Sequence, residues 1–377
     1  MSRRLRVAMI GQRGVPATFG GVERHVEEIG SRLAAKGHEI TVYSRTNYTT
    51  DRSDVYRGMR VRHLPTVPSK HLDAIVHSGL STVAAMADRV DVVHYHAIGP
   101  GLPSFLPRAL SRAKVVQTIH GRDAERAKWG GAARTVLRTG EWLSARVPDA
   151  TIVVSRDLAE TYRATYRRHT TVIPNGVDPG TRRPATSITE RWGLTEGSYV
   201  LFVGRLVPEK APDLLIRAFR DVPGDVRLVV AGGSSFTDEY VADLQRAAAR
   251  DPRVLLAGYV YGDLLDELYT NAALFVLPSA LEGLPLTLLE AASYGTPVLA
   301  SSIPPHVEVL GEDAPGQRLV PSGSQAELTR ALASTLEDRE QERAGALVLK
   351  ARILETYRWD DVAASTEDVY LEVVGGR

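Results

Sequence analysis

The chain has 377 residues, of which 44% are apolar and 24% charged, and it contains no cysteine. This composition is that of a globular protein of two or three domains, and it excludes a disordered or collagen-like chain. The lack of cysteine excludes disulfides, thiolate metal sites and cysteine nucleophiles, and it favours a reducing compartment.

The net charge of +1 conceals an asymmetry along the chain. Residues 1–177 carry 27 Lys and Arg against 15 Asp and Glu, whereas residues 178–377 carry 19 against 30. A basic half followed by an acidic half indicates two domains with different partners. The basic N-terminus is followed by an apolar run, Val7–Ile10, that is too short for a signal peptide, and no segment has the length of a membrane-spanning helix. We therefore expect a soluble, cytoplasmic protein.

The first half of the chain alternates strands and helices. Leu5–Ile10 is a short apolar strand, Gly11–Gly21 is a glycine-rich loop, and Val22–Lys36 places its apolar residues on one helical face. A second strand at Glu39–Ser44 completes a β-α-β unit, which implies parallel strands. Further strands are expected at Val90–His94, Lys114–Thr118, Ala150–Val154 and Thr171–Ile173.

The second half repeats this alternation after Asp178–Ser187, a polar segment with two prolines that is typical of a linker. Its expected strands are Tyr199–Val203, Val226–Ala231, Val254–Ala257, Ala273–Leu277 and Pro297–Ala300. Its expected helices are Pro212–Phe219, Tyr240–Arg250, Leu264–Ala272 and Thr287–Tyr294. The pattern predicts an α/β protein with two doubly wound, Rossmann-like domains. Such sheets bind ligands beyond the carboxyl ends of their strands, so we expect the two domains to face each other across a ligand-binding cleft.

Two carboxylates follow the expected strand Ala273–Leu277. Glu282 lies in the loop at the strand's carboxyl end, and Glu290 lies eight residues further on, near the start of a helix. Backbone N–H groups from Gly283 to Thr287 can hold an anion, and carboxylates accept hydrogen bonds from neighbouring hydroxyls. The pattern suits a sugar, a diphosphate and a ribose. The alternative is ordinary placement of acidic residues near a helix N-terminus.

Two cations follow the first strand of the second half. Arg205 and Lys210 lie between a strand and a helix, where a guanidinium fork and a compact ammonium both match a diphosphate. Two solvated surface cations are the alternative. Together with the two glutamates, the pair favours a phosphate-binding function.

The glycine-rich loop of the first half offers a weaker signal. It has neither the dinucleotide-binding spacing GxGxxG nor the P-loop spacing. Gly20 and Gly21 at a helix N-terminus still permit close approach of a phosphate or a sugar, although a tight turn explains them equally well.

Histidines follow two strands of the first half. His120 would project into the cleft, although a single histidine is more often a core residue. His94 and His96 have no third ligand at a usable spacing. We therefore expect no metal site.

These residues together resemble the retaining glycosyltransferases of the GT-B fold, family four, of the group 1 type. The resemblance rests on the spacing of Arg205, Lys210, Glu282 and Glu290 and on Gly20–Glu23, His120-Gly121, Ile173–Asp178 and Arg358–Asp360. The segment Gly11–Pro16 is similar to a subgroup that builds bacterial capsule and cell-wall polysaccharide, which includes rhamnosyltransferases. One departure is Ser301-Ser302, where the family often has Ser-Asp or Thr-Asp.

The resemblance implies a division of the chain. Residues 1–177 would bind the acceptor, and residues 178–357 would bind the nucleotide sugar. A last helix, at about residues 358–377, would cross back to the first domain.

The resemblance also implies roles for the site residues. Arg205 and Lys210 would neutralise the donor diphosphate, Glu282 would bind the transferred sugar, and Glu290 would bind the ribose. Gly20 and Gly21 would lie against the phosphate or the sugar, and His120 would lie near the anomeric centre. The remaining donor-binding positions form the loop Gly283, Leu284, Pro285, Leu286 and Thr287. No metal or other cofactor is implied, because Arg and Lys stabilise the leaving diphosphate.

We therefore expect a glycosyltransferase that moves a sugar from a nucleotide donor to a saccharide or lipid-linked acceptor. A nucleotide-sugar epimerase or hydrolase on the same fold is one alternative, and a non-catalytic sugar-nucleotide binding protein is another. Nucleic acid is not an expected partner, because the basic half lacks interleaved aromatic residues for base stacking.

Part of the positive charge gathers in one stretch with apolar residues interleaved. This stretch contains Arg122, Arg126, Lys128, Trp129, Arg134, Leu137, Arg138, Trp142 and Leu143. Tryptophan beside basic residues on a helix is typical of a segment that lies on an anionic membrane. A solvated helix with its tryptophans in the core is the alternative. The membrane interpretation predicts a peripheral enzyme with a lipid-linked acceptor at the cytoplasmic face.

Overall fold

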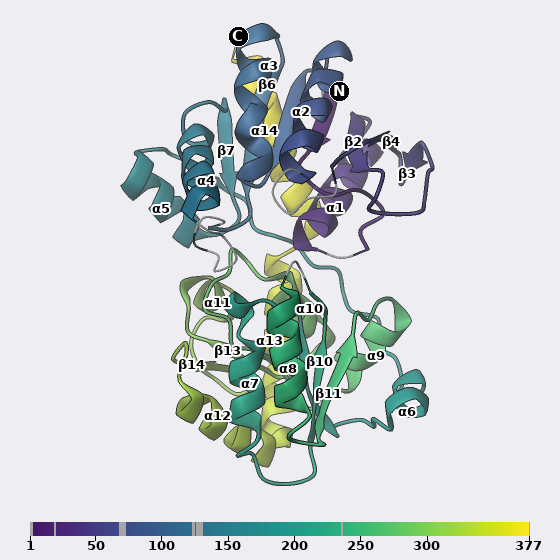
Figure 1. Ribbon diagram of the computed structural model, residues 1–377, viewed down its shortest axis with the longest axis vertical. Coiled ribbons are helices and arrows are strands. Elements are labelled where there is room, and N and C mark those ends of the chain that lie inside the picture. The colour runs from purple at the N-terminus through teal and green to yellow at the C-terminus, as the bar shows by residue number, and fades with distance from the viewer. Residues whose placement is uncertain are drawn as a thin grey trace. The chain divides into compact units, whose positions relative to one another are not determined.

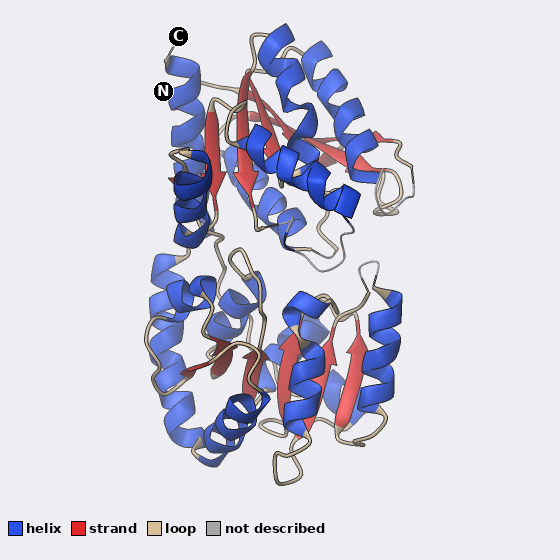
Figure 2. Cartoon of the chain, turned by 60° about the vertical axis from the view of Figure 1, so that its left-hand side comes forward, coloured by secondary structure: helices blue, strands red, loops and turns tan. Residues whose placement is uncertain are grey.

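The computed structural model describes residues 3–18, 20–67, 73–122, 125, 131–234 and 237–376. The chain divides into two compact units, here called unit 1 (Met1–Gly176 with Trp359–Arg377) and unit 2 (Val177–Arg358). Each unit has a sheet with helices on both of its faces (Figure 2). Within the described ranges, no helix has both the length and the apolar character needed to cross a membrane.

Unit 1 is built on an eight-stranded sheet with the order β3-β4-β2-β1-β5-β6-β7-β8 (Figure 1). Its strands are β1 (Arg6–Ile10), β2 (Glu39–Arg45), β3 (Val55–Tyr56), β4 (Met59–Leu64), β5 (Val92–His96), β6 (Lys114–Ile119), β7 (Ala150–Val153) and β8 (Thr171–Val172). Its helices are α1 (Gly21–Ala35), α2 (Asp73–Ala87), a 3₁₀ helix (Gly99–Ser104), α3 (Phe105–Leu110), α4 (Gly131–Ser144), α5 (Arg156–Tyr166) and α14 (Trp359–Gly375).

Unit 2 is built on a six-stranded sheet with the order β11-β10-β9-β12-β13-β14. Its strands are β9 (Tyr199–Val203), β10 (Arg227–Ala231), β11 (Val254–Gly258), β12 (Leu274–Leu277), β13 (Val298–Ser301) and β14 (Gln317–Val320). Its helices are α6 (Ser187–Trp192), a 3₁₀ helix (Pro208–Lys210), α7 (Pro212–Phe219), α8 (Asp238–Ala248), α9 (Asp263–Asn271), α10 (Leu286–Tyr294), α11 (Pro304–Leu310), α12 (Gln325–Glu337) and α13 (Arg339–Thr356).

The strand orders locate the sites at which each sheet can bind a ligand. In unit 2 the chain winds outward from β9 in one direction and then from β12 in the other, so the order reverses between these two neighbours. In unit 1 the same reversal lies between β1 and β5. Open α/β sheets bind ligands at the carboxyl ends of the strands beside such a reversal. Ligand-binding residues are therefore expected in the loops after β9 and β12 and in those after β1 and β5.

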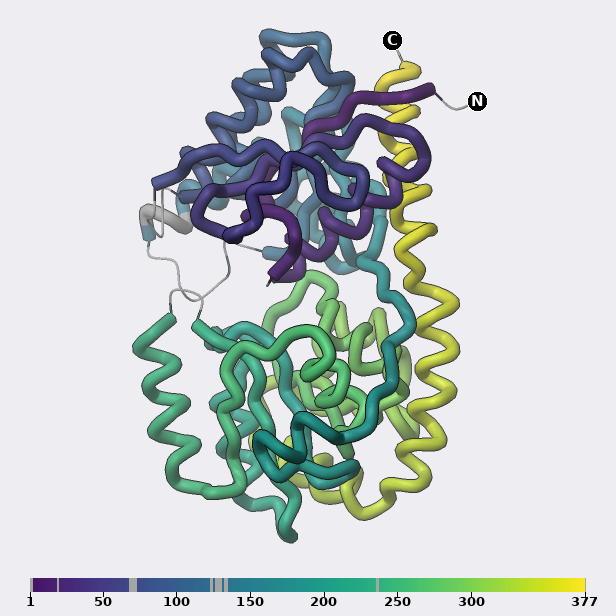
Figure 3. The backbone as a smooth tube through the Cα atoms, turned by 90° about the vertical axis from the view of Figure 1, so that its right-hand side faces the viewer, coloured from purple at the N-terminus to yellow at the C-terminus, as the bar shows by residue number. Residues whose placement is uncertain are grey.

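The last helix belongs to unit 1 although the chain reaches it from unit 2. Figure 3 follows this C-terminal segment in yellow. Lys36 on α1 forms an ion pair with Glu367 on α14 at 2.6 Å, and Arg32 pairs with Asp360 at 2.8 Å. Trp359 is buried against Gly176, where a Cβ would lie 2.6 Å from the indole ring. These contacts fasten α14 to the first part of the chain.

The expectation of two Rossmann-like α/β domains is confirmed, and each strand expected from the sequence is present to within two or three residues. The central strands were recognisable because they are continuous apolar runs buried on both faces, whereas β8 is exposed and β11 only partly buried. One difference is at the edge of the first sheet, where β3 pairs with β4 in the antiparallel direction. All other pairings between the described strands are parallel.

Candidate functional site

The loops after β9 and β12 bring Lys210 and Glu282 together. Nζ of Lys210 is 2.6 Å from Oε1 of Glu282, and the hydroxyl of Ser279 donates to the same oxygen at 2.8 Å. Both side chains of the pair are only 12% exposed. Burial alone would raise the pKa of Glu282, but the charge of Lys210, together with His306 and the Ser279 hydroxyl, holds that pKa below its usual value. Glu282 is therefore an ionised carboxylate with a fixed partner.

Two glycines shape the approach to this pair. A Cβ on Gly232 would lie 1.8 Å from the carbonyl oxygen of Gly204, and the φ angle of Gly232 is +150°. A Cβ on Gly204 would stand 3.0 Å from Cδ of Lys210. The bare backbone after β9 and β10 thus lets the two loops touch, and it lets the methylene stem of Lys210 lie over Gly204.

His306 on α11 is a member of this site that the sequence did not reveal. Its Nδ1 is 2.8 Å from the carbonyl oxygen of Ser301, which can only accept, so Nδ1 carries the hydrogen. Its Nε2 is buried and has no hydrogen-bond partner among the described residues. Burial lowers the pKa of His306 to about 4, so the ring is neutral at neutral pH. In the sequence, His306 follows shortly after Ser301-Ser302, the loop that departs from the family pattern.

Glu290 on α10 is held by an aromatic residue. The hydroxyl of Tyr269 donates to Oε2 of Glu290 at 3.0 Å, and the Tyr269 ring stacks on Tyr294 with centroids 5.2 Å apart. Burial, and then the charge of Glu290, raise the pKa of Tyr269 well above its ordinary value, so that the phenol remains a donor. The contact fixes the direction of the Glu290 carboxylate.

The start of α10 is a mostly buried loop that supplies backbone donors. Gly283, Leu284 and Pro285 are buried, and Leu286 and Thr287 are partly buried. The helix begins with no side-chain cap on Pro285, and Oγ1 of Thr287 has no hydrogen-bond partner in the part of the chain that the structure describes. An uncapped helix start with a spare hydroxyl can accept an anion.

Arg205 stands on the same loop as Lys210 and is half-buried. Its carbonyl oxygen accepts from the N–H of Val207 at 3.0 Å. The turn places Arg205 at the carboxyl end of β9, next to the point where the strand order reverses.

The glycine-rich loop of unit 1 is held by a glutamate. Gly20 has a φ of +105°, and a Cβ there would lie 2.0 Å from Oε2 of Glu23. Oε1 of Glu23 accepts from the N–H of Arg13 at 3.0 Å. Gly20 and Gly21 are exposed at the start of α1. The turn itself therefore requires a glycine at position 20. The backbone of both glycines remains accessible to a ligand.

Histidines gather at the strand-order reversal of unit 1. Nδ1 of His96 is 3.3 Å from Nε2 of His120, and the ring of His25 packs edge-on against His120 with centroids 4.7 Å apart. Nδ1 of His25 is 2.9 Å from Oδ1 of Asn175. The sequence showed no third ligand for His94 and His96 at a usable spacing, but the fold brings His25 and His120, from distant parts of the chain, beside His96. His94 instead belongs to the core, where it contacts Tyr370 at 2.6 Å and Thr118 at 2.7 Å.

The basic stretch of unit 1 is described only in part. Arg126, Lys128 and Trp129 lie outside the described residues, as does the side chain of Arg134. Arg122 is paired with Asp157 at 2.8 Å. On α4, Leu137 is buried and Leu143 partly buried, whereas Arg138 is exposed and Trp142 is 51% exposed. Trp142 therefore does not serve the core.

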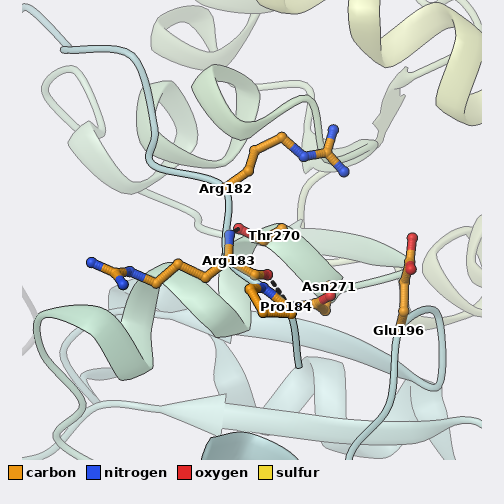
Figure 4. Close-up of a pocket in the computed structure, with 6 residues that line it drawn as sticks. All are labelled: Arg182, Arg183, Pro184, Glu196, Thr270 and Asn271. Carbon is orange, nitrogen blue, oxygen red and sulfur yellow. Dashed lines mark hydrogen bonds between the residues drawn. The ribbon is translucent and has the colours of Figure 1, made fainter. Parts of the chain in front are cut away.

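A separate small pocket of about 250 Å³ lies in unit 2 (Figure 4). It is lined by Arg182, Arg183, Pro184, Glu196, Thr270 and Asn271. Glu196 precedes β9 and Asn271 precedes β12, so the pocket is at the amino ends of these strands. Arg183 is paired with Asp263 at 2.6 Å and with Asp266 at 3.2 Å. The pocket is thus at the opposite end of the strands from Lys210 and Glu282, and one of its two arginines, Arg183, is neutralised by the aspartates.

Comparison with known proteins identifies the family. Residues 19–181 match the model described as Glycosyltransferase Family 4, and residues 186–346 match Glycosyl transferases group 1. The chain is 30% identical to D-inositol 3-phosphate glycosyltransferase of Xylanimonas cellulosilytica over 99% of its own length and 98% of that protein. The chain belongs to the group 1 glycosyltransferases. It is also 30% identical to glycogen synthase of Mycobacterium tuberculosis, over 99% of this chain and 96% of that protein.

Solved structures agree with the fold of this glycosyltransferase. Sucrose-phosphate synthase from Thermosynechococcus elongatus superposes with a TM-score of 0.84 at 22% identity and covers 99% of this chain and 100% of that one. Anabaena HepE, solved with UDP and glucose, gives a TM-score of 0.80 at 19% identity, with 97% and 99% covered. The fold is GT-B, and the chain is a glycosyltransferase that acts on nucleotide sugars.

Proposed function

We propose that this glycosyltransferase moves a hexosyl or deoxyhexosyl group from a nucleoside-diphosphate sugar to a saccharide or lipid-linked acceptor, with retention of anomeric configuration. The observation that carries the proposal is the mostly buried ion pair of Lys210 and Glu282 at the strand-order reversal of unit 2. The segment Gly11–Pro16 favours assembly of a bacterial polysaccharide or glycoconjugate, with rhamnosyl transfer as one form.

The reaction breaks the bond between the anomeric carbon and the diphosphate oxygen. Negative charge then grows on the departing diphosphate and positive charge on the sugar. Arg205, Lys210 and the uncapped start of α10 are the groups that stabilise the departing charge. The acceptor oxygen forms the new glycosidic bond on the same face, and its proton passes to the departing phosphate.

Lys210 and Glu282 divide the donor between them. A bound diphosphate offers Lys210 a more highly charged partner than Glu282, so the two side chains separate when the donor arrives. Glu282 is already ionised, and its oxygens then accept from the hydroxyls of the transferred sugar, beside the N–H groups of Gly283 and Leu284. Glu290, aimed by Tyr269, binds the ribose hydroxyls.

The other roles fall to unit 1. Gly20 and Gly21 offer exposed backbone for close contact with the phosphate or the sugar. We also assign His120 a role at the anomeric centre. The diphosphate needs no bridging metal ion, because Arg205 and Lys210 supply the positive charge.

Transfer assays with UDP-, GDP- and dTDP-sugars test the proposal. UDP-sugars come first, because HepE binds UDP and glucose. The expected product is a glycoside whose anomeric configuration, read from NMR coupling constants, equals that of the donor. Inversion would contradict the retaining mechanism. Product formation without any acceptor would instead favour an epimerase or a hydrolase, and binding without turnover would favour a non-catalytic protein.

Chelation tests the metal-independent mechanism. We expect excess EDTA to leave the transfer rate unchanged. A loss of activity that Mg²⁺ or Mn²⁺ restores would show a bridging ion at the diphosphate.

We also propose that unit 1 associates with an anionic membrane at the cytoplasmic face through α4. Support comes from Trp142 and Val136, which are 51% and 44% exposed on this helix, and from the exposed Arg138. An exposed tryptophan beside a cation suits the interface of a lipid bilayer. A lipid-linked acceptor would then be presented to unit 1.

A further inference from the structure

Three histidines from distant segments meet at the carboxyl edge of the first sheet. His25 is on α1, His96 ends β5, and His120 follows β6. One ring nitrogen from each lies within 4.8 Å of the other two. Gly11, at the end of β1, permits this gathering, because a Cβ there would lie 2.2 Å from the carbonyl oxygen of His96.

The ring nitrogens that face one another include lone-pair nitrogens. Oδ1 of Asn175 can only accept, so Nδ1 of His25 carries its hydrogen and Nε2 of His25 carries the lone pair. The 3.3 Å contact between His96 and His120 joins two ring nitrogens, of which only one can carry a hydrogen when both rings are neutral. Nε2 of His25 and at least one of the two nitrogens in this contact therefore carry lone pairs.

Burial disfavours a positive charge on two of these rings. His25 and His96 are 2% and 0% exposed. Desolvation lowers the pKa of His25 to about 4 and the pKa of His96 well below its usual value. Neutral imidazole is the form that binds a metal ion.

The layer behind the group orients it in the manner of a metal site. Asn175 fixes the tautomer of His25, as an outer partner of a metal-bound histidine does. His94 lies behind His96 with ring centroids 4.1 Å apart, and both of its nitrogens are engaged by Tyr370 and Thr118. His94 is therefore not a ligand. Nε2 of His96 has no hydrogen-bond partner in the described ranges, so Nε2 can carry the ring hydrogen and leave the lone pair on Nδ1, which faces His120.

The donor set selects the ion. Three neutral nitrogens favour Zn²⁺ and its neighbours in the transition series over Mg²⁺ or Ca²⁺, which prefer oxygen. Tetrahedral Zn²⁺ with bonds of about 2.0–2.1 Å holds its ligand nitrogens about 3.4 Å apart. The His96–His120 separation of 3.3 Å already matches. His120 is only partly buried, so its ring can turn to bring the remaining nitrogens from 4.8 Å to that spacing.

We propose that His25, His96 and His120 form a binding site for one Zn²⁺-type ion, with a fourth position open to water. The site shares no residue with Arg205 and Lys210, the proposed diphosphate-binding cations of unit 2. Its consequence for activity rests on the proposed function. An ion that occupies His120 removes this side chain from the anomeric centre, so Zn²⁺ inhibits transfer reversibly.

Metal titration of the full chain, purified without a histidine tag and stripped with a chelator, tests the site. Co²⁺ is the spectroscopic probe, and Zn²⁺ is measured by competition with a chromophoric chelator. We expect one Co²⁺ per chain with the intense visible bands of a tetrahedral nitrogen site, and displacement by Zn²⁺. Loss of an outer partner of a ligand costs about 10–100-fold in metal affinity, so loss of a ligand in His120→Ala or in His25→Gln should weaken Zn²⁺ binding by at least that much. The control His169→Ala removes an exposed histidine elsewhere in unit 1 and should leave the affinity unchanged.

The outcomes separate this proposal from the proposed function. Absence of stoichiometric binding, or equal affinity in the wild type and both cluster variants, overturns the metal site. His120 is only partly buried, so the His120→Ala variant should fold. Circular dichroism verifies this before the titration. Stoichiometric binding that leaves the transfer rate unchanged supports the site and contradicts the placement of His120 near the anomeric carbon.

Discussion

Lys210 and Glu282 neutralise each other in a buried setting, so single and double replacements should act differently. Lys210→Ala leaves an ionised, nearly buried Glu282 without its partner. We expect the free energy of unfolding to fall by roughly 3–5 kcal/mol. We also expect kcat/KM to fall by about 10²–10³, because one charge-stabilising contact to the departing diphosphate is lost. Urea denaturation and steady-state kinetics measure the two effects.

The double variant Lys210→Ala/Glu282→Gln separates stability from catalysis. It removes the unpaired charge, so most of the lost unfolding free energy should return while activity stays low. If the double variant is no more stable than Lys210→Ala, the charge of Glu282 is not what destabilises the single variant, and Lys210 does not serve to neutralise it. Near-normal turnover of Lys210→Ala would contradict its role at the diphosphate.

Glu290 and Tyr269 allow a graded test of ribose recognition. Glu290→Ala should weaken binding of free nucleoside diphosphate, because the ribose loses its carboxylate acceptor. Tyr269→Phe keeps the stacked ring and removes only the 3.0 Å hydrogen bond, so its effect should be smaller. Glu282→Ala is the matched control, since it should lower turnover far more than diphosphate affinity. Calorimetry on the three variants measures this order, and equal losses for Glu282→Ala and Glu290→Ala would contradict the division of roles.

At the scale of the elements, sequence periodicity located the central strands but not every helix. Strands such as Tyr199–Val203 are apolar throughout and buried, which makes them recognisable. Helix α13 was missed because its apolar pattern is blurred: Leu349 and Ile353 are buried, whereas Leu347 and Val348 are exposed. The antiparallel strand β3 has two residues, too few for any periodicity.

The site residues that could be predicted from the sequence are those that directly follow a strand. Lys210 and Glu282 come after β9 and β12, and the sheet brings their loops together. Their partner His306 could not be foreseen, because its place depends on how α11 packs after β13. The histidine group has the same origin: His25, His96 and His120 are separated by 71 and 24 residues, and only the strand order unites them.

Helix α11 should respond to pH through His306. In the folded protein the pKa of His306 is about 4, below the ordinary value of 6.5, because burial disfavours the charged ring. Lys210 acts in the same direction as burial, whereas Glu282 and the Ser301 backbone oppose it. Between these values the unfolded chain binds the proton and the folded chain does not. The contribution of His306 to the free energy of unfolding is therefore fully present above pH 6.5. This contribution, about 3 kcal/mol in all, is lost as the pH falls to about 4.

Replacement of the ring isolates this contribution. His306→Asn should flatten the dependence of unfolding free energy on pH between 6.5 and 4, whereas His169→Asn, at an exposed position, should leave the slope as it is. Urea denaturation at several pH values compares the variants. Equal slopes in wild type and His306→Asn would show that another group controls acid stability.

At the scale of the whole molecule, the charge asymmetry changes when it is counted by unit. Unit 1 includes α14, whose acidic residues bring its net charge to +8, and unit 2 carries −7. Part of this compensation is direct, through the ion pairs of Lys36 with Glu367 and Arg32 with Asp360. A net charge of +8 on one unit still attracts an anionic partner at low ionic strength.

The membrane proposal predicts that binding needs both this charge and the exposed tryptophan of α4. In sedimentation with vesicles, the protein should bind phosphatidylglycerol-containing bilayers and not pure phosphatidylcholine. Binding should weaken as salt rises from about 0.01 M to 1 M, because the Debye length falls from about 30 to 3 Å. Trp142→Ser should weaken binding at every salt concentration, because the indole contributes apolar burial that salt does not screen.

Val348→Ser is the matched control, since Val348 is 72% exposed on α13 of unit 2 and should not touch the bilayer. Arg138→Ser should reduce binding mainly at low salt, where each basic residue near the surface contributes about 1 kcal/mol. If Trp142→Ser and Val348→Ser behave alike, α4 is not the contact. If the wild type stays in solution at low salt with anionic vesicles, the acceptor is not reached through the membrane, and the positive charge of unit 1 serves a soluble, anionic saccharide instead.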